Sequence, residues 1–236
     1  MIEGAAAGSL EGIALLAPLD TAERAALARR CRWLRYGAGD PVLDQESEGR
    51  DVCFVVEGRV RVVSHAANGR EISFDDIAAG GLVGEMAAVD GQPRSASVVA
   101  LDEGTLIAHL AAAPFRTLVT GRPDLALAVM RRLAGIGRRT TERVMELSTL
   151  AANNRVHAEL LRLARRAAAA DGRTAVIDPA PVHADIAARV STTRETVARV
   201  LNDLARDGLV ERRGHALILH DLPELEAMVE HVRGRG

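Results

Sequence analysis

Between residues 31 and 110, short apolar runs alternate with glycine-centred turns. The clearest runs are 51–56, 59–63, 97–101 and 105–107, each rich in residues that favour strands. Asn68-Gly69 lies between two such runs and predicts a tight hairpin, because this dipeptide readily adopts the positive φ angles of a two-residue turn. Short strands at regular spacing predict a β-barrel or jelly roll.

Beyond Pro114 the apolar period lengthens to three or four residues, which predicts helix. Pro123 suits a first helical turn. An apolar seam then continues over about 28 residues, or about 42 Å of helix. Its members are Leu127, Met130, Leu133, Ile136 or Gly137, Thr140, Val144, Leu147 and Leu150 or Ala151. A seam on so long a helix either packs on the chain's own barrel or forms a coiled coil with a second copy. Asn153-Asn154 is predicted to end it, with a further helix over 155–170.

Two short amphipathic helices follow, joined by a turn at Ser191-Thr192. Their apolar faces are Ile186, Ala187 and Val190 in the first, and Val197, Val200, Leu201 and Leu204 in the second. The short turn and the small residue at the crossing point predict a helix-turn-helix. Residues 209–219 alternate around Arg213-Gly214 and predict a hairpin, or wing.

The patterns together predict an α+β protein in three parts. These are a β-barrel or jelly-roll domain over 1–122, a dimerisation helix over 123–152 and a winged helix-turn-helix domain over 153–236. The formal net charge of −2 neither favours nor excludes nucleic acid as a partner. The chain contains no lysine, so all 30 basic residues are arginine.

Several classes of protein are disfavoured. No apolar run approaches the roughly 18 residues of a membrane helix, and the first twenty residues carry Glu3, Glu11 and Asp20 but no basic residue of a secretory leader. Cys31 and Cys53 are too few and too far apart for a zinc knuckle or an iron–sulfur cluster. We expect a cytoplasmic protein with no membrane partner, metal, haem or iron–sulfur cluster.

Residues 80–99 contain a candidate anion site. Gly84 and Glu85 open a predicted short helix whose free N–H groups suit an anion. Arg94 offers a fork for a phosphate diester, and Ser95 adds a hydroxyl beside it. A carboxylate at Glu85 suits a ribose hydroxyl; the alternative is a structural ion pair between Arg94 and Glu85. The glycine-rich loops that bind nucleoside triphosphates and dinucleotides are missing.

Arg194, Glu195 and Arg199 lie on the polar face of the second short helix. Arginine can donate two hydrogen bonds to guanine, and glutamate can accept one from cytosine. These residues therefore predict base contacts in the DNA major groove. The alternatives are a solvated face for the arginines and, for Glu195, a capping box with Thr192.

At this point the chain resembles a known family. Gly84-Glu85-Met86 with Pro93-Arg94-Ser95-Ala96 resembles the phosphate-binding cassette of cyclic-nucleotide-binding domains. Thr193-Arg194-Glu195-Thr196-Val197 with Arg199 resembles the recognition helix of the cyclic-AMP receptor proteins. The Crp/Fnr family, to which those proteins belong, has the predicted order of domains and consists of homodimeric transcription factors. The resemblance extends from about Leu15 to His220.

The resemblance implies the ligand and the residues that bind it. Cyclic AMP or cyclic GMP would act as effector, with Glu85 on the ribose 2′-hydroxyl and Arg94 and Ser95 on the cyclic phosphate. The implied ligand-binding set is Val83, Gly84, Glu85, Met86, Arg94, Ser95, Thr140 and Thr141, the two threonines contacting the base. Where the receptor protein has an arginine on the long helix, this sequence has Ile136.

The resemblance also implies the partners. The DNA-binding set is His183, Thr193, Arg194, Glu195, Thr196, Arg199, Asn202 and Arg213. The expected partners are a palindromic operator with TGTGA-like half-sites, a second copy of the chain and RNA polymerase. The same fold with another effector, or with none, is the first alternative. An enzyme regulated by the barrel is disfavoured, because the winged domain takes up the remaining residues.

Gly135 and Gly137 interrupt the long helix one turn before the two threonines. Each glycine costs about 1 kcal/mol of helix stability relative to alanine. One hypothesis is that this segment frays without ligand and is ordered by it; the other is that the glycines only let two helices approach closely.

Overall fold

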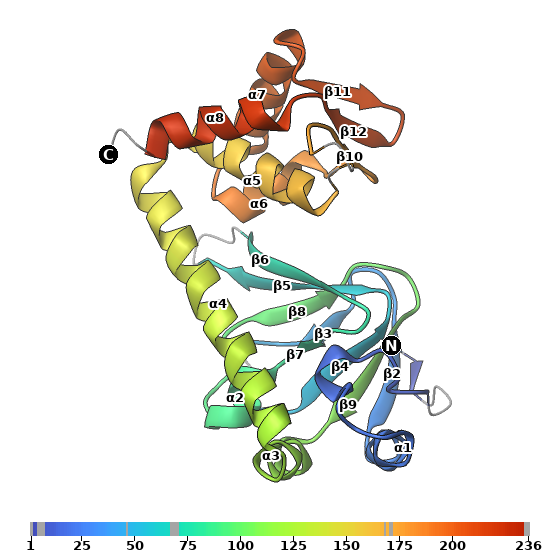
Figure 1. Cartoon of the computed structure of the whole chain (residues 1–236). Coiled ribbons are helices and arrows are strands. Elements are labelled where there is room, and N and C mark those ends of the chain that lie inside the picture. The colour runs from blue at the N-terminus through green and yellow to red at the C-terminus, as the bar shows by residue number, and fades with distance from the viewer. Residues whose placement is uncertain are drawn as a thin grey trace. The chain divides into compact units, whose positions relative to one another are not determined.

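The computed structural model describes residues 2–3, 8–45, 47–66, 71–167, 169 and 172–233. The chain divides into two compact units, Met1–Gly137 and Arg138–Gly236, with the division inside the long helix α4 (Pro123–Thr149). Figure 1 shows the first unit built mainly of strands and the second mainly of helices. The predicted α+β class and the order of its parts are confirmed. No helix in the described ranges is long and apolar enough to cross a membrane.

The described strands of the first unit form two antiparallel sheets, as the strand pattern predicts. Their orders are β1-β2-β9-β4-β7 and β3-β8-β5-β6. The strands are β1 Ile2–Glu3, β2 Arg32–Tyr36, β3 Pro41–Leu43, β4 Val52–Glu57, β5 Arg59–His65, β6 Glu71–Ala78, β7 Leu82–Val83, β8 Ser97–Ala100 and β9 Thr105–Leu110. Strands β5 and β6 pair from Arg59↔Ala78 to His65↔Glu71, as a hairpin requires. The predicted turn at Asn68-Gly69 lies outside the described residues.

The core of the first unit has two layers because side chains alternate along each strand. In β2, Leu34 and Tyr36 face the space between the sheets, whereas Trp33 belongs to the layer beneath the helices. Every residue of β9 is buried, since helices cover the outer face of its sheet. The helices of this unit are η1 Ala14–Leu16, α1 Thr21–Ala28, α2 Glu85–Asp90, α3 Ala112–Thr120 and the first part of α4.

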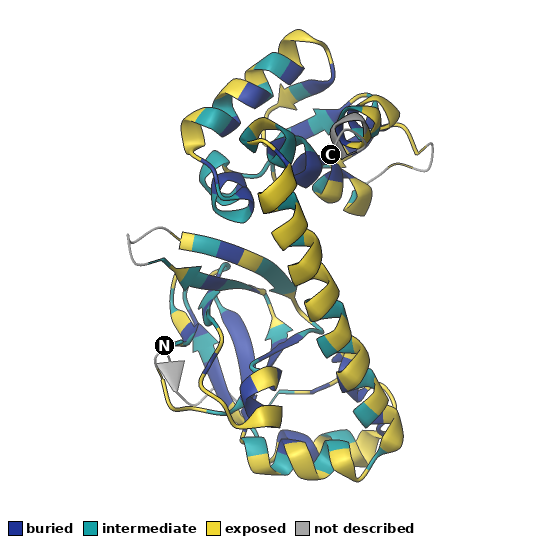
Figure 2. Ribbon diagram, turned by 90° about the vertical axis from the view of Figure 1, so that its left-hand side faces the viewer, coloured by how far each residue is buried: buried dark blue, intermediate teal, exposed yellow. Residues whose placement is uncertain are grey.

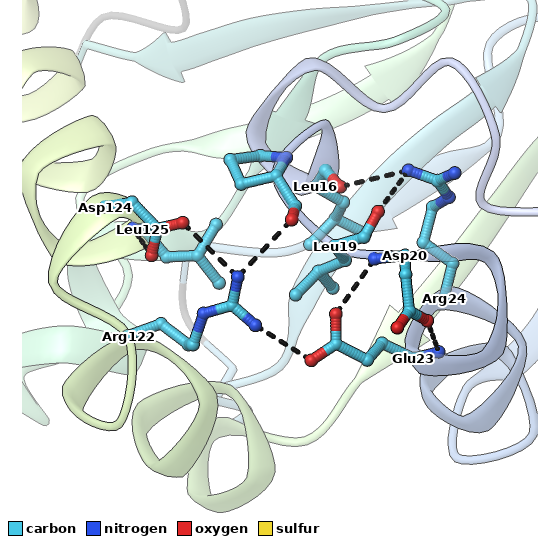
Figure 3. Close-up of polar contacts among 9 residues, drawn as sticks. Leu16, Leu19, Asp20, Glu23, Arg24, Arg122, Asp124 and Leu125 are labelled. Atoms are coloured by element: carbon cyan, nitrogen blue, oxygen red, sulfur yellow. Dashed lines mark hydrogen bonds and ion pairs between the residues drawn. The ribbon is translucent and has the colours of Figure 1, made fainter.

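The start of α4 is fixed to the region around α1. Arg122 donates to the Glu23 carboxylate at 2.8 Å and to the Pro18 carbonyl at 3.3 Å (Figure 3). Glu23 also completes the capping box of α1 with Asp20. Leu125 and Val129, in the first and second turns of α4, are buried in the helix-covered core layer.

The rest of α4 is largely exposed, as Figure 2 shows. Part of the predicted seam packs on the chain itself, because Leu133 lies against the core of the first unit. Other members remain exposed to 40–57%, namely Leu127, Met130, Val144 and Leu147. The helix therefore has an exposed apolar face in addition to the face that packs on the barrel.

The second unit is a winged helix-turn-helix. Its helices beyond α4 are α5 Ala152–Arg166, α6 His183–Val190, α7 Arg194–Arg206 and α8 Leu222–Arg233. Its strands, in the order β10-β12-β11, are β10 Ala175–Ile177, β11 Val210–Arg213 and β12 Ala216–Leu219. The predicted apolar faces of α6 and α7 meet in one core, and β11 and β12 form the predicted wing. The third strand, β10, was not predicted.

The prediction that Asn153-Asn154 ends the long helix is wrong. Both residues lie within the first turn of α5, which begins at Ala152 and ends at Arg166. The break is instead at Leu150 and Ala151, where Leu150 is buried and Ala151 has an extended backbone with ψ of 157°. Asparagine is tolerated in a first helical turn, so burial of Leu150 decides where the chain bends.

The turn between α6 and α7 holds a strained residue. Ser191 has φ of 52° and ψ of 51°, the left-handed region that favours glycine. Such a backbone costs a residue with a side chain about 1–2 kcal/mol. Ser191→Gly is therefore expected to raise the free energy of unfolding by about 1 kcal/mol, measured by urea denaturation with circular dichroism. Ser191→Ala is the control and gains nothing; equal stability of the glycine and alanine variants would show that the turn is unstrained.

Candidate functional site

The cassette is built around a backbone position that only glycine fits. Gly84 ends β7 and caps α2 with φ of 84°. A Cβ placed there would lie 2.5 Å from an Arg94 nitrogen and 2.7 Å from the Asp51 carbonyl oxygen. The backbone and the Arg94 guanidinium thus approach more closely than any side chain at position 84 allows.

Arg94 is a buried cation that forms no ion pair with a carboxylate among the described residues. The residue is 5% exposed, and its two terminal nitrogens donate to the carbonyls of Gly84 at 3.0 Å and Asp51 at 2.8 Å. Its Nε is buried and has no hydrogen-bond acceptor among the described residues. Burial lowers the pKa of the guanidinium from its usual value. An anion in contact with Arg94 would supply both the missing acceptor and a direct ion-pair partner.

The expected alternative, an Arg94–Glu85 ion pair, does not form. Glu85 is 4% exposed, and its Oε1 accepts from Nε of Arg132, on α4, at 2.5 Å. Arg132 also donates to the Leu82 carbonyl at 2.5 Å. Glu85 of the cassette is therefore attached to α4 through Arg132, which lies one turn before Ile136. The sequence pattern did not predict this contact.

The other predicted ligand residues differ in exposure. Ser95 is exposed, and its hydroxyl donates to Sδ of Met86 at 3.7 Å. Val83 is 3% exposed in the barrel core, so only its backbone is available to a ligand. Thr140 and Thr141 are exposed on the part of α4 that belongs to the second unit. Their contact with the base of a ligand remains a prediction.

A polar cluster lies in the barrel core behind the cassette. Both ring nitrogens of His109 form hydrogen bonds: Nε2 with the Tyr36 hydroxyl at 2.9 Å and Nδ1 with Sγ of Cys53 at 3.2 Å. Burial lowers the pKa of His109 to about 4 and raises the pKa of the Cys53 thiol well above its usual value. With these pKa values, all three groups are neutral at physiological pH. The described residues contain no group of three or more His, Cys, Asp or Glu side chains that could hold a metal ion.

The predicted DNA-contacting residues of α7 lie on one exposed face. Arg194, Glu195, Arg199 and Asn202 are exposed, whereas Val197, Val200 and Leu204 face the core. The helix is capped by Thr193, whose hydroxyl accepts from the Thr196 N–H at 3.2 Å. The alternative capping box between Thr192 and Glu195 is therefore wrong, because the helix starts one residue later than that pattern requires.

Glu195 is poised to accept hydrogen bonds. Bonds from its own backbone N–H and from the Thr193 hydroxyl hold the pKa of this carboxyl below its usual value. The side chain is exposed and stays ionised at physiological pH, the state that can accept from cytosine. His183 is the first residue of α6 and is half-buried.

The wing places two adjacent arginines at its tip. Arg213 donates to the Glu211 carboxylate at 3.1–3.2 Å, and His220 contacts the same carboxylate at 3.2 Å. Arg212 is exposed and precedes the turn at Gly214. Glu211 would compete with a DNA phosphate for Arg213. Arg212 is a further candidate phosphate contact, which the sequence pattern did not indicate.

Both halves of the chain match known protein families. Residues 33–121 match the cyclic nucleotide-binding domain family, and residues 154–228 match the Crp-like helix-turn-helix domain family. The "Cyclic AMP receptor protein" of Thermus thermophilus is 35% identical over 178 residues, which cover 74% of this chain and 77% of that protein.

Two further relatives extend the match. A "CRP-like cAMP-activated global transcriptional regulator" of Mycobacterium tuberculosis is 26% identical over 201 residues, covering 85% of this chain and 89% of that protein. Among solved structures, a mutant of CooA from Carboxydothermus hydrogenoformans has a TM-score of 0.74 at 24% identity, covering 85% of this chain and 88% of that one. This last likeness concerns the fold alone.

Proposed function

The chain belongs to the Crp/Fnr family of transcription regulators, and we propose that it is a homodimer whose DNA binding is gated by cyclic AMP. The family consists of regulators rather than enzymes. A cyclic-nucleotide-binding domain and a Crp-like helix-turn-helix domain are both present in the chain. The identity of the effector, the homodimer and the palindromic operator are our proposals.

The observation that carries the proposal is the state of Arg94. A buried guanidinium with an unsatisfied Nε, and with no ion pair to a carboxylate among the described residues, favours binding of an anion. A cyclic phosphate has one negative charge and oxygens that match a guanidinium. Ser95 adds an exposed hydroxyl, and Glu85 has a second carboxylate oxygen, Oε2, that could accept from a ribose hydroxyl.

The exposed apolar face of α4 supports a second copy as partner. Leu127 and Met130 are three residues apart, as are Val144 and Leu147, and all four are exposed. This spacing is typical of a coiled-coil seam, and apolar residues exposed in a row are stabilised by a matching face. Two copies related by a twofold axis would present two α7 helices to a palindromic operator.

Gating follows from where the ligand-binding residues lie. Glu85 and Arg94 belong to the cassette, and Thr140 and Thr141 belong to α4, which continues to the DNA-binding unit. Arg132, also on α4, holds Glu85. A ligand that contacts both sets changes the relative stability of α4 arrangements, and DNA must then tighten ligand binding by the same factor. We expect the dimer to act in the bacterial cytoplasm with RNA polymerase as its partner.

Calorimetric titration of the full chain with cyclic AMP and cyclic GMP tests the proposed effector. We expect saturable binding of cyclic AMP at one site per chain, with cyclic GMP weaker. Binding of neither nucleotide would favour the alternative, in which the same fold responds to another effector or to none.

Arg132→Gln tests how the ribose is recognised. Loss of the guanidinium removes the contact that orients Glu85, so the carboxylate should select less strongly for a ribose 2′-hydroxyl. We expect the preference for cyclic AMP over 2′-deoxy-cyclic AMP to fall about tenfold, with little change in affinity for the deoxy ligand. Arg131→Gln, at the exposed neighbouring position, is the matched control. An unchanged preference in Arg132→Gln would show that the ion pair has no part in binding.

A further inference from the structure

One carboxylate of the wing is bound by side chains from both of its strands. Glu211, on β11, accepts from Nε and Nη2 of Arg213 at 3.1–3.2 Å, so the guanidinium contacts both carboxylate oxygens. His220, directly after β12, contacts the same carboxylate through Nε2 at 3.2 Å. Figure 1 shows the two strands side by side. Contacts from both strands therefore hold the Glu211 side chain in place.

The two adjacent arginines of the wing lie on opposite faces of its sheet, because neighbouring side chains of a strand alternate. Arg212 pairs with Leu217, whose side chain is buried in the core of the second unit, and Arg213 pairs with Ala216. Glu211 therefore shares a face with Arg213 and not with Arg212. The exposed guanidinium of Arg212 forms no ion pair within the described part of the chain.

Glu211 and a DNA phosphate need the same donors of Arg213. A hydrogen bond from Arg213, with a smaller contribution from His220, holds the pKa of the Glu211 carboxyl below its usual value, so this group is ionised at neutral pH. The Arg213 side chain is 70% exposed, so a phosphate can reach it. Carboxylates and phosphates both accept from the fork of a guanidinium. The edge of Arg213 that holds Glu211 can bind a phosphate only after this ion pair opens.

The DNA-binding part of the chain has little positive charge to spare. Residues 151–236 include 13 arginines, no lysine and 12 acidic residues. Binding to DNA of unrelated sequence depends almost entirely on contacts between cations and phosphates. With so small an excess of positive charge, one restrained arginine on the wing makes up a large part of that attraction.

We propose that Glu211 restrains the wing: by holding Arg213 it keeps this arginine from DNA phosphate, and it thereby limits the affinity for DNA of any sequence. The two adjacent arginines then differ in role. Arg212 is available to a phosphate at once, whereas Arg213 becomes available when its ion pair with Glu211 opens. The inference rests on the proposed function, because it assigns a regulation to the same DNA interface.

Glu211→Gln tests the restraint, because glutamine keeps the shape of the side chain and removes its charge. The probe is a fluorescent DNA duplex without a TGTGA-like half-site, titrated with the full chain in the absence of cyclic nucleotide. We expect affinity to rise about two- to fivefold, the effect of an exposed ion pair. The plot of log affinity against log salt should steepen by up to about 0.9, the effect of one further phosphate contact. Equal affinity and an equal slope would overturn the restraint.

This outcome is independent of the proposed operator and effector, since neither an operator half-site nor a cyclic nucleotide is present. Glu226→Gln controls for the loss of one negative charge, because Glu226 of α8 forms an exposed ion pair with Arg165. We expect it to leave DNA affinity nearly unchanged, since a charge far from the phosphates is screened by salt. A gain in Glu226→Gln equal to that in Glu211→Gln would contradict the proposal.

A double-mutant cycle tests whether the gain passes through Arg213. In an Arg213→Ala background, Glu211→Gln should give no gain in DNA affinity. In an Arg212→Ala background, the matched control, the gain of about two- to fivefold should remain. Equal gains in both backgrounds would show that Glu211 acts through its own charge alone and would overturn the proposal.

A second variant guards against a change in the fold of the wing. Glu211→Thr also removes the charge and suits a strand, so it should give the same gain as Glu211→Gln. Thermal denaturation followed by circular dichroism shows whether each variant is folded. A folded Glu211→Thr variant that binds DNA no more tightly than the unmodified chain would contradict the restraint.

Discussion

Replacing Arg94 with alanine is expected to weaken cyclic AMP binding by about 10- to 150-fold, because hydrogen bonds to charged groups contribute about 1.5–3 kcal/mol each. The loss arises from the guanidinium–phosphate contact. Isothermal titration of the variant and the unmodified chain measures it. Affinity equal to that of the unmodified chain would mean that Arg94 only supports the cassette backbone.

Controls separate binding from folding. Arg94 also holds the carbonyls of Gly84 and Asp51, so alanine removes a structural contact as well. Arg94→Lys keeps the charge but not the fork, and we expect intermediate affinity. Thermal denaturation of both variants shows whether the first unit remains folded. If Arg94→Ala is folded and binds cyclic AMP weakly, Arg94 contacts the ligand directly.

Arg194→Ala is expected to lower operator affinity by about 5- to 150-fold, because a bidentate contact with guanine contributes about 1–3 kcal/mol. The preference at one G·C pair of each TGTGA-like half-site should relax, while the other positions keep theirs. Selection from a random DNA pool measures both effects. A non-palindromic or purely A·T-rich consensus for the unmodified chain would contradict the operator prediction.

Two further arginines serve as comparisons. Arg206, in the last turn of α7, pairs with Asp203 at 2.7 Å, so Arg206→Ala should leave the base preference unchanged. Arg213→Ala, on the wing, should weaken binding to all sequences alike, because a phosphate contact carries no sequence information. A change in the consensus DNA sequence selected by Arg213→Ala would show that Arg213 contacts bases rather than phosphate.

The parts of the fold with local signals could be predicted from the sequence. The strands β5 and β6, the short helix after Gly84 and the faces of α6 and α7 depend on residues that are close along the chain. The cap of α7 shows the limit of such signals. Thr192 and Thr193 both fit an N-cap, and burial of Thr192 decides in favour of Thr193.

The contacts that shape the site could not be predicted in the same way. Arg132 meets Glu85 across 47 residues, and Arg155 meets Ser191 across 36. Nothing in the local pattern distinguishes these arginines from the others on exposed helix faces. Only the packing of α4 on the cassette, and of α5 on the helix-turn-helix, selects them.

The measurement that tests ligand-gated DNA binding most directly is the coupling free energy between cyclic AMP and operator DNA, measured through the affinity of each. Operator affinity is measured with and without saturating cyclic AMP, and cyclic AMP affinity with and without operator. We predict that cyclic AMP tightens operator binding by about 5- to 150-fold and that operator tightens cyclic AMP binding by the same factor. Operator affinity that is identical with and without cyclic AMP, in a chain that binds both, would contradict gating.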